Sequence, residues 1–131
     1  MSIIVVYALE APPLSYEHAI FLAGPTPRDP LTPSWRPEAL RILEDMGYNG
    51  VVFVPEPRSG VWATDYMDQA SWEQRCIKMS DTTVFWVPRN MRSMPGLTTN
   101  VEFGRKVDQY NLVFGAPEEA EKVRYLEWLG G

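Results

Sequence analysis

The sequence has a single cysteine, Cys76, and a single histidine, His18. An internal disulfide cannot form, and these two residues are too few for a tetrahedral zinc site of cysteine and histidine. A lone cysteine is typical of a reducing compartment, so we expect a cytoplasmic location and no metal. No apolar run approaches the ~20 residues of a membrane-spanning helix. The first residues also lack a basic segment, so we expect no signal peptide.

Basic residues are in the minority, with 12 Lys and Arg against 17 Asp and Glu and a net charge of -5. This balance disfavours binding to duplex nucleic acid or to an anionic membrane surface. It leaves room for a small nucleotide, which a few well-placed groups can hold. With 131 residues, of which 45% are hydrophobic, we expect a single globular domain over residues 1–131.

Short apolar runs alternate with stretches of helical periodicity along the whole chain. This order predicts an α/β fold with a mainly parallel sheet of about five strands and helices on both faces. We expect strands at 3–8, 19–24, 50–57, 82–89 and 111–117. We expect helices at 36–48, 64–80, 98–110 and 117–129.

The loops that follow the expected strands are rich in proline and arginine. In parallel α/β sheets, ligands bind beyond the carboxyl ends of the strands, which is where these loops lie. Proline lowers the entropy cost of holding such a loop in one shape. Arg28 and Arg89 are therefore candidate ligand contacts, with a surface charge and a salt bridge as their respective alternatives. Trp62 and Trp72 are candidates for stacking on a flat ligand or for packing in the core.

Glu73 lies within the second expected helix, on one face with Tyr66, Ala70 and Ile77. The rest of this face is apolar, so the Glu73 carboxylate should be at least partly covered. A covered carboxylate needs a partner or a raised pKa. A salt bridge to an arginine and a functional acid are both compatible with this position.

Glu102 is expected in the first turn of the third helix, after a Pro-Gly turn. Free N–H groups and the helix dipole favour an ionised carboxylate there. Glu102 is therefore either a helix-end charge or a reagent. Asn100, two residues earlier, is either a substrate contact or a helix cap, and Gly104 would leave room for a close neighbour.

Four segments, in their order and spacing, carry a resemblance to a known family: "AIFLAGPTPR", "SWEQ", "SDTTVFWVPR" and "MPGLTTNVEFG". They resemble the nucleoside 2-deoxyribosyltransferase family, in its type II or nucleoside 2-deoxyribosyltransferase-like branch. The ending "VRYLEWL" is similar to that branch as well. The resemblance covers most of the chain from Phe21 onward and implies a Rossmann-like, flavodoxin-like three-layer sandwich.

The resemblance also implies roles for individual residues. Glu102 matches the nucleophile that attacks C1' of deoxyribose, and Glu73 matches an acid that helps to fix the sugar or the nucleophile. Phe21 stands where the better-known branch has a tyrosine, and the aspartate that this branch places before the nucleophile is absent. With the loop residues above, the expected substrate-binding set is Phe21, Gly24, Pro25, Thr26, Arg28, Trp62, Trp72, Arg89 and Asn100.

The activity implied by the resemblance is cleavage of the N-glycosidic bond of a 2'-deoxynucleoside. Deoxyribose then passes to another nucleobase through a covalent glutamyl-deoxyribosyl intermediate. The family needs no metal or organic cofactor, and its members are usually homo-oligomers. The alternatives are a deoxynucleotide N-glycoside hydrolase that releases the free base, for which Arg28 would contact a phosphate, and a non-catalytic nucleotide-binding module.

Overall fold

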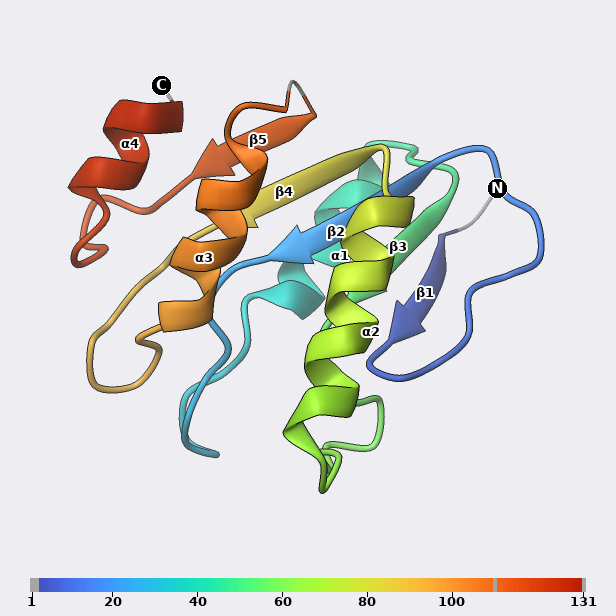
Figure 1. Cartoon of the computed structure of the whole chain (residues 1–131), viewed down its shortest axis with the longest axis horizontal. Helices are drawn as coiled ribbons and strands as arrows, with labels where there is room; N and C mark the ends of the chain where they lie inside the picture. Colours follow the sequence, from blue (N-terminus) through green and yellow to red (C-terminus); the bar gives the residue numbers. More distant parts are fainter. Residues whose placement is uncertain (1–2, 110, 131) are drawn as a thin grey trace. The chain divides into compact units, whose positions relative to one another are not determined.

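A computed structural model describes residues 3–109 and 111–130 of the chain (Figure 1). Within these residues the strands form a five-stranded sheet in the order β1-β3-β2-β4-β5. This confirms the prediction of an α/β fold with a parallel sheet of five strands and alternating helices. The elements are β1 (Ile4–Tyr7), β2 (Ala19–Ala23), α1 (Arg36–Asp45), β3 (Val51–Val54), α2 (Tyr66–Met79), β4 (Thr82–Trp86), α3 (Leu97–Lys106), β5 (Leu112–Gly115) and α4 (Arg124–Gly130).

The chain divides into two compact units that interleave along the sequence. The first unit comprises Met1–Leu22 and Trp35–Thr82, and the second comprises Ala23–Ser34 and Thr83–Gly131. Each unit is described by itself below. The expectation of one domain over residues 1–131 stays a prediction.

The first unit is built around β3, whose four residues are all buried. β1 and β2 both pair with β3 in parallel, with Ile4 opposite Val51 and Ala19 opposite Val51 on its two sides. A strand with neighbours on both edges and helices on both faces has to be continuously apolar, which explains the run "VVFV". α1 and α2 lie on opposite faces of these strands (Figure 1).

The second unit is built around the parallel pair β4 and β5, whose register places Phe85 opposite Phe114. Phe103 of α3 packs edge-to-face against both of these rings, with centroids 5.3 Å from Phe85 and 5.4 Å from Phe114. Phe103 is fully buried. This aromatic cluster fixes α3 on the strand pair, and thereby fixes the position of every other residue of that helix.

Two helix boundaries differ from the predictions by one helical turn or more. The last helix was expected over 117–129, but α4 starts at Arg124. A turn closed by the Ala120 N–H and the Pro117 carbonyl occupies the earlier residues, and Lys122 has a left-handed backbone with φ 56 that interrupts any helix. The third helix was expected to end at Tyr110, which lies outside the described residues, and α3 ends at Lys106.

Candidate active site

Glu102 occupies the sixth position of α3, which begins at Leu97, one residue before the expected start at Thr98. The expectation that Glu102 lies in the first turn is therefore wrong. The helix dipole acts on charges within the first turn, so it does not account for an acid at this position. The Glu102 side chain is on the buried face of α3 and only 9% exposed. Acidic residues are rarely covered to this extent unless their charge is compensated or used.

The early start of α3 follows from Gly96, which precedes the helix in a left-handed conformation with φ 58 and ψ 49. No side chain caps this helix end, so the usual polar signal for a helix start is missing from the sequence. Gly96 also lies against the turn that follows β2. A Cβ added to Gly96 would be 2.8 Å from the Pro25 Cβ. Both the backbone conformation and the space therefore require glycine at this position.

Replacing Gly96 with alanine is expected to destabilise the protein. The left-handed backbone alone costs a residue with a Cβ about 1–2 kcal/mol, and the contact with Pro25 adds to this. Urea denaturation followed by circular dichroism measures the change in the free energy of unfolding. Gly104→Ala is the matched control in the same helix, because open space surrounds Gly104. Alanine there should stabilise the helix by roughly 0.5–1 kcal/mol. Equal stability of the Gly96 variant and the wild type would contradict the role assigned to Gly96.

Gly104 itself was expected to leave room for a close neighbour. Apart from its chain neighbours and the backbone of its own helix, no atom of the described residues lies within 4 Å of the position of its missing Cβ, so the space beside Gly104 is open. The residue lies on the exposed face of α3, and a close neighbour there stays a prediction.

The turn after β2 carries four of the predicted substrate-binding residues. Gly24 has φ 145, and Pro25 is fully buried. Thr26 is half-buried, and the Arg28 side chain is exposed. The Arg28 N–H donates to the Ser93 carbonyl at 2.8 Å, which ties this turn to the loop before α3. In the second unit, the turn and the start of α3 thus support each other.

Arg89 follows β4 and is 3% exposed. Its guanidinium donates to the Lys122 carbonyl at 2.7 Å, to the Asn100 Oδ1 at 2.6 Å and to the Gly96 carbonyl at 3.3 Å. Burial lowers the pKa of Arg89 from its usual value. The salt-bridge alternative is not realised among the described residues, because carbonyl and amide oxygens receive the hydrogen bonds of both terminal nitrogens. The Arg89 Nε is buried and has no hydrogen-bond partner among these residues, so a ligand contact by Arg89 stays a prediction. Arg89 holds the first turn of α3 in place.

Asn100 is the fourth residue of α3 and not its cap, since Gly96 occupies the cap position. The helix-cap alternative for Asn100 is therefore wrong. Its Oδ1 accepts from Arg89, which fixes the orientation of the amide. The residue as a whole is exposed at the surface of the second unit. A substrate contact by Asn100 stays a prediction.

Glu73, in the first unit, is half-buried, as the pattern of α2 predicted. Its Oε2 accepts from the Gln69 Nε2 at 2.8 Å. None of the ion pairs found among the described residues joins Glu73 to an arginine. The salt-bridge alternative is not realised, and Gln69 takes the place of the arginine. Because Gln69 lies one turn before Glu73, the contact fixes the carboxylate along its own helix.

The aromatic candidates of the first unit are in different environments. Trp72 is 3% exposed, with its ring centroid 6.4 Å from that of Phe21 and 6.3 Å from that of Phe53, and its Nε1 donates to the Glu10 carbonyl at 2.9 Å. Phe21 is fully buried. Both residues serve as core packing in this structure. Trp62, in the loop after β3, is 47% exposed and keeps a surface on which a flat ligand can stack.

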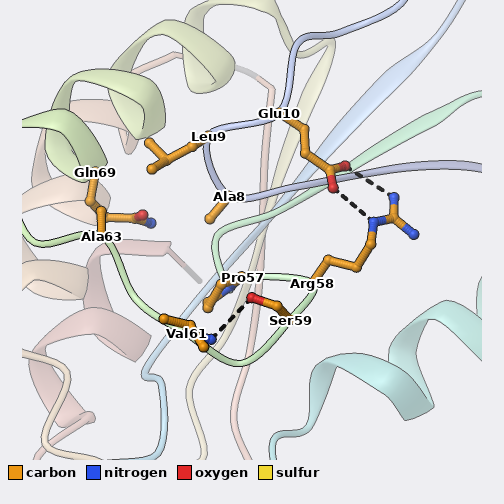
Figure 2. A pocket seen from close by; sticks show the side chains of 9 residues that line it. All are labelled: Ala8, Leu9, Glu10, Pro57, Arg58, Ser59, Val61, Ala63 and Gln69. Atoms are coloured by element: carbon orange, nitrogen blue, oxygen red, sulfur yellow. Dashed lines mark hydrogen bonds and ion pairs between the residues drawn. The ribbon is translucent and has the colours of Figure 1, made fainter.

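A cavity of about 400 Å³ lies in the first unit, at the carboxyl ends of β1 and β3 (Figure 2). None of the residues that line it was among the site residues expected from the sequence. The cavity depends on the pairing of β1 with β3, which the order of elements did not predict. The residues that line it are Ala8, Leu9, Glu10, Pro57, Arg58, Ser59, Val61, Ala63 and Gln69.

Two further findings concern the described residues as a whole. They contain no group of three or more His, Cys, Asp and Glu side chains that would hold a metal ion. In the same part of the chain, no helix combines the length and the apolar character that crossing a membrane requires. Comparisons with protein-family models and with curated proteins find no match to this chain.

Proposed function

We propose that the protein cleaves the N-glycosidic bond of a 2'-deoxynucleoside, with Glu102 as the nucleophile, and transfers the deoxyribose to another nucleobase. The observation that carries this proposal is the burial of Glu102 in the second turn of α3, where it is 9% exposed. A helix-end charge would lie one turn earlier and need not be covered. The resemblance of "MPGLTTNVEFG" to the family's nucleophile segment points to the same residue.

The proposed reaction has two displacements at the same carbon. A carboxylate oxygen of Glu102 attacks C1', and the C1'–N bond breaks with its electron pair passing to the base, which takes up a proton. The glutamyl-deoxyribosyl ester then reacts with a nitrogen of a second base, which loses a proton as the ester bond to Glu102 breaks. Two displacements retain the configuration at C1'. Water in place of the second base would give hydrolysis.

Other residues of the second unit support this chemistry by fixing α3. Arg89 joins the carbonyl of Gly96 to the side chain of Asn100, so the first turn of the helix is held by a buried cation. The turn from Gly24 to Arg28 packs on the same end through Pro25. A nucleophile on a helix held at this end keeps one orientation, which lowers the cost of reaching the transition state.

The role of Glu73 as an assisting acid is part of the same proposal, and so is assembly into a homo-oligomer in the cytoplasm. Support for Glu73 comes from its partial burial and its fixed orientation by Gln69. Glu73→Gln should lower kcat while leaving the fold intact, since an amide keeps the size of the side chain. Light scattering coupled to gel filtration measures the oligomeric state.

A turnover assay tests the proposed function. A panel of 2'-deoxynucleosides and their monophosphates is incubated with and without a second free base, and the products are separated by chromatography. Base exchange that requires the second base supports the transferase. Base release without an acceptor, and faster with the monophosphates, indicates a deoxynucleotide hydrolase instead. Binding of a nucleotide without any turnover indicates a binding module and contradicts the catalytic proposal.

A further inference from the structure

The cavity in the first unit, here called the Gln69 pocket, is formed by three segments: Ala8–Glu10 after β1, Pro57–Ala63 after β3, and Gln69 on α2. Its volume of about 400 Å³ is within the range of small-molecule sites, which span roughly 300–1,000 Å³. Most of its lining side chains are apolar. Figure 2 shows the amide end of Gln69 pointing into the space that the other labelled residues surround.

The orientation of the Gln69 amide is fixed by its two neighbours. Its Nε2 donates to the Glu73 Oε2 at 2.8 Å and to the Pro55 carbonyl at 3.4 Å, and both partners are acceptors only. The amide oxygen Oε1 is therefore directed away from Glu73 and from the Pro55 carbonyl. Oε1 is buried and accepts no hydrogen bond from any described residue, although Gln69 is 8% exposed. A buried acceptor without a donor costs about 1–3 kcal/mol. A ligand that donates a hydrogen bond to Oε1 would offset this cost.

The wall of the pocket after β1 is held in an uncommon conformation. Leu9 has a left-handed backbone with φ 68, a conformation that costs a residue other than glycine free energy. Hydrogen bonds on both sides of Leu9 maintain it: the Ala8 N–H donates to the Glu56 carbonyl, and the Glu10 N–H donates to the Tyr7 carbonyl. Strained residues that the surrounding structure holds in place are concentrated at ligand sites.

The two charged residues of the pocket neutralise each other. The Arg58 guanidinium donates to both carboxylate oxygens of Glu10, at 2.7 and 3.0 Å (Figure 2). The same guanidinium also lies over the ring of Tyr7. The Arg58 hydrogen bond, with a further one from the Tyr7 N–H, lowers the pKa of Glu10. The pair therefore stays charged and matched at neutral pH. No net charge is left to attract an anion, so the pocket favours a neutral ligand.

From these observations we propose that the Gln69 pocket binds a neutral molecule with an apolar ring and an N–H donor, which Oε1 of Gln69 accepts. The ring lies against the apolar lining side chains, such as Leu9 and Val61, and the donor satisfies the buried acceptor. Because Gln69 also holds Glu73, a ligand in this pocket contacts the residue that orients that acid. This proposal does not depend on the activity of Glu102.

The first test uses the wild-type chain and two probes of matched shape. Indole provides an N–H donor on a neutral apolar ring, whereas its analogue benzofuran has nearly the same shape and no N–H. Titration calorimetry measures both dissociation constants. We expect the analogue to bind about 10-fold more weakly or worse, since it leaves the buried Oε1 without a donor. Adding a phosphate to the probe should not tighten binding.

Three variants separate the hydrogen bond from shape and from folding. Gln69→Met keeps the length of the side chain and removes the acceptor, so the two probes should bind with nearly equal, weak affinity. Gln74→Met, on the same helix but outside the pocket lining, should leave the preference of the wild type unchanged. Ala63→Phe fills the cavity from its loop without altering Gln69, and should abolish binding of both probes. Circular dichroism checks that each variant is folded.

The proposal is overturned if the wild type binds neither probe, or binds both equally well. It is also overturned if Gln69→Met retains the preference, since a group other than Oε1 of Gln69 would then accept the N–H of the probe. Glu102→Gln should bind the probes as the wild type does. A wild-type protein that transfers no deoxyribose but still distinguishes the probes would contradict the proposed function and leave the Gln69 pocket in place.

Discussion

Replacing Glu102 with glutamine is expected to reduce deoxyribosyl transfer by on the order of 1,000-fold or more, since an amide oxygen is a poor nucleophile toward C1'. The substitution keeps the size of a side chain that is 9% exposed in the middle of α3. The fold should therefore be retained while the reaction is lost. Initial rates of base exchange, measured by chromatography at saturating donor, give the loss in kcat.

Two further measurements make this prediction specific. Glu119→Gln changes an exposed acid of the same unit and should leave the rate unchanged. Wild-type protein quenched in acid during turnover should carry a deoxyribosyl adduct on the peptide that contains Glu102, detected by mass spectrometry. A Glu102 variant that keeps more than roughly a tenth of the wild-type rate is inconsistent with a nucleophile at this position.

Replacing Arg36 with methionine should have the largest effect on stability. Arg36 is 1% exposed, donates from Nε to the Leu22 carbonyl at 3.0 Å, and pairs with the Glu56 carboxylate at 2.6 Å. It also lies 4.6 Å from the centre of the Trp35 ring. Removing one partner of a buried ion pair costs about 3–5 kcal/mol. Because the Glu56 side chain keeps 20% exposure, we expect a loss toward the lower end of this range. Urea denaturation measures this loss in the free energy of unfolding.

Arg41→Met is the matched control for Arg36, since it removes an arginine from the same helix. The Arg41 guanidinium pairs with Glu38 and Asp45, but all three side chains are more than half exposed. Exposed pairs of this kind add little to stability. The variant should therefore unfold close to the wild-type midpoint. Adding Glu56→Gln to Arg36→Met should recover part of the lost stability. Equal stability of Arg36→Met and Arg41→Met would contradict the larger contribution expected from the buried ion pair.

The strands were predictable from the sequence because each is a short apolar run between turn residues. Val51–Val54 is buried on both faces and therefore reads as apolar throughout. The start of α3 was expected at Thr98, one residue after its actual start at Leu97, but the reason for it was not predictable. A polar cap usually marks such a start, but here Gly96 provides a left-handed backbone, a property that its sequence position does not reveal.

In the candidate site, too, the local features were predictable from the sequence and the features that join distant segments were not. Partial burial of Glu73 followed from the spacing of apolar residues on one helix face, which is a local property. Its partner Gln69, the buried position of Trp72 and the Gln69 pocket depend on which strands pair and on the left-handed Leu9. These features join segments far apart in the sequence, so spacing along the chain carries little information about them.

The interleaving of the two units has a consequence for synthesis on the ribosome. The segment Ala23–Ser34 belongs to the second unit but leaves the ribosome in the middle of the first. Its partners Ser93 and Gly96 emerge much later. This proline-rich turn therefore lacks its contacts with Ser93 and Gly96 while the first unit is being synthesised. The proline residues restrict the backbone conformations of the turn until these contacts can form.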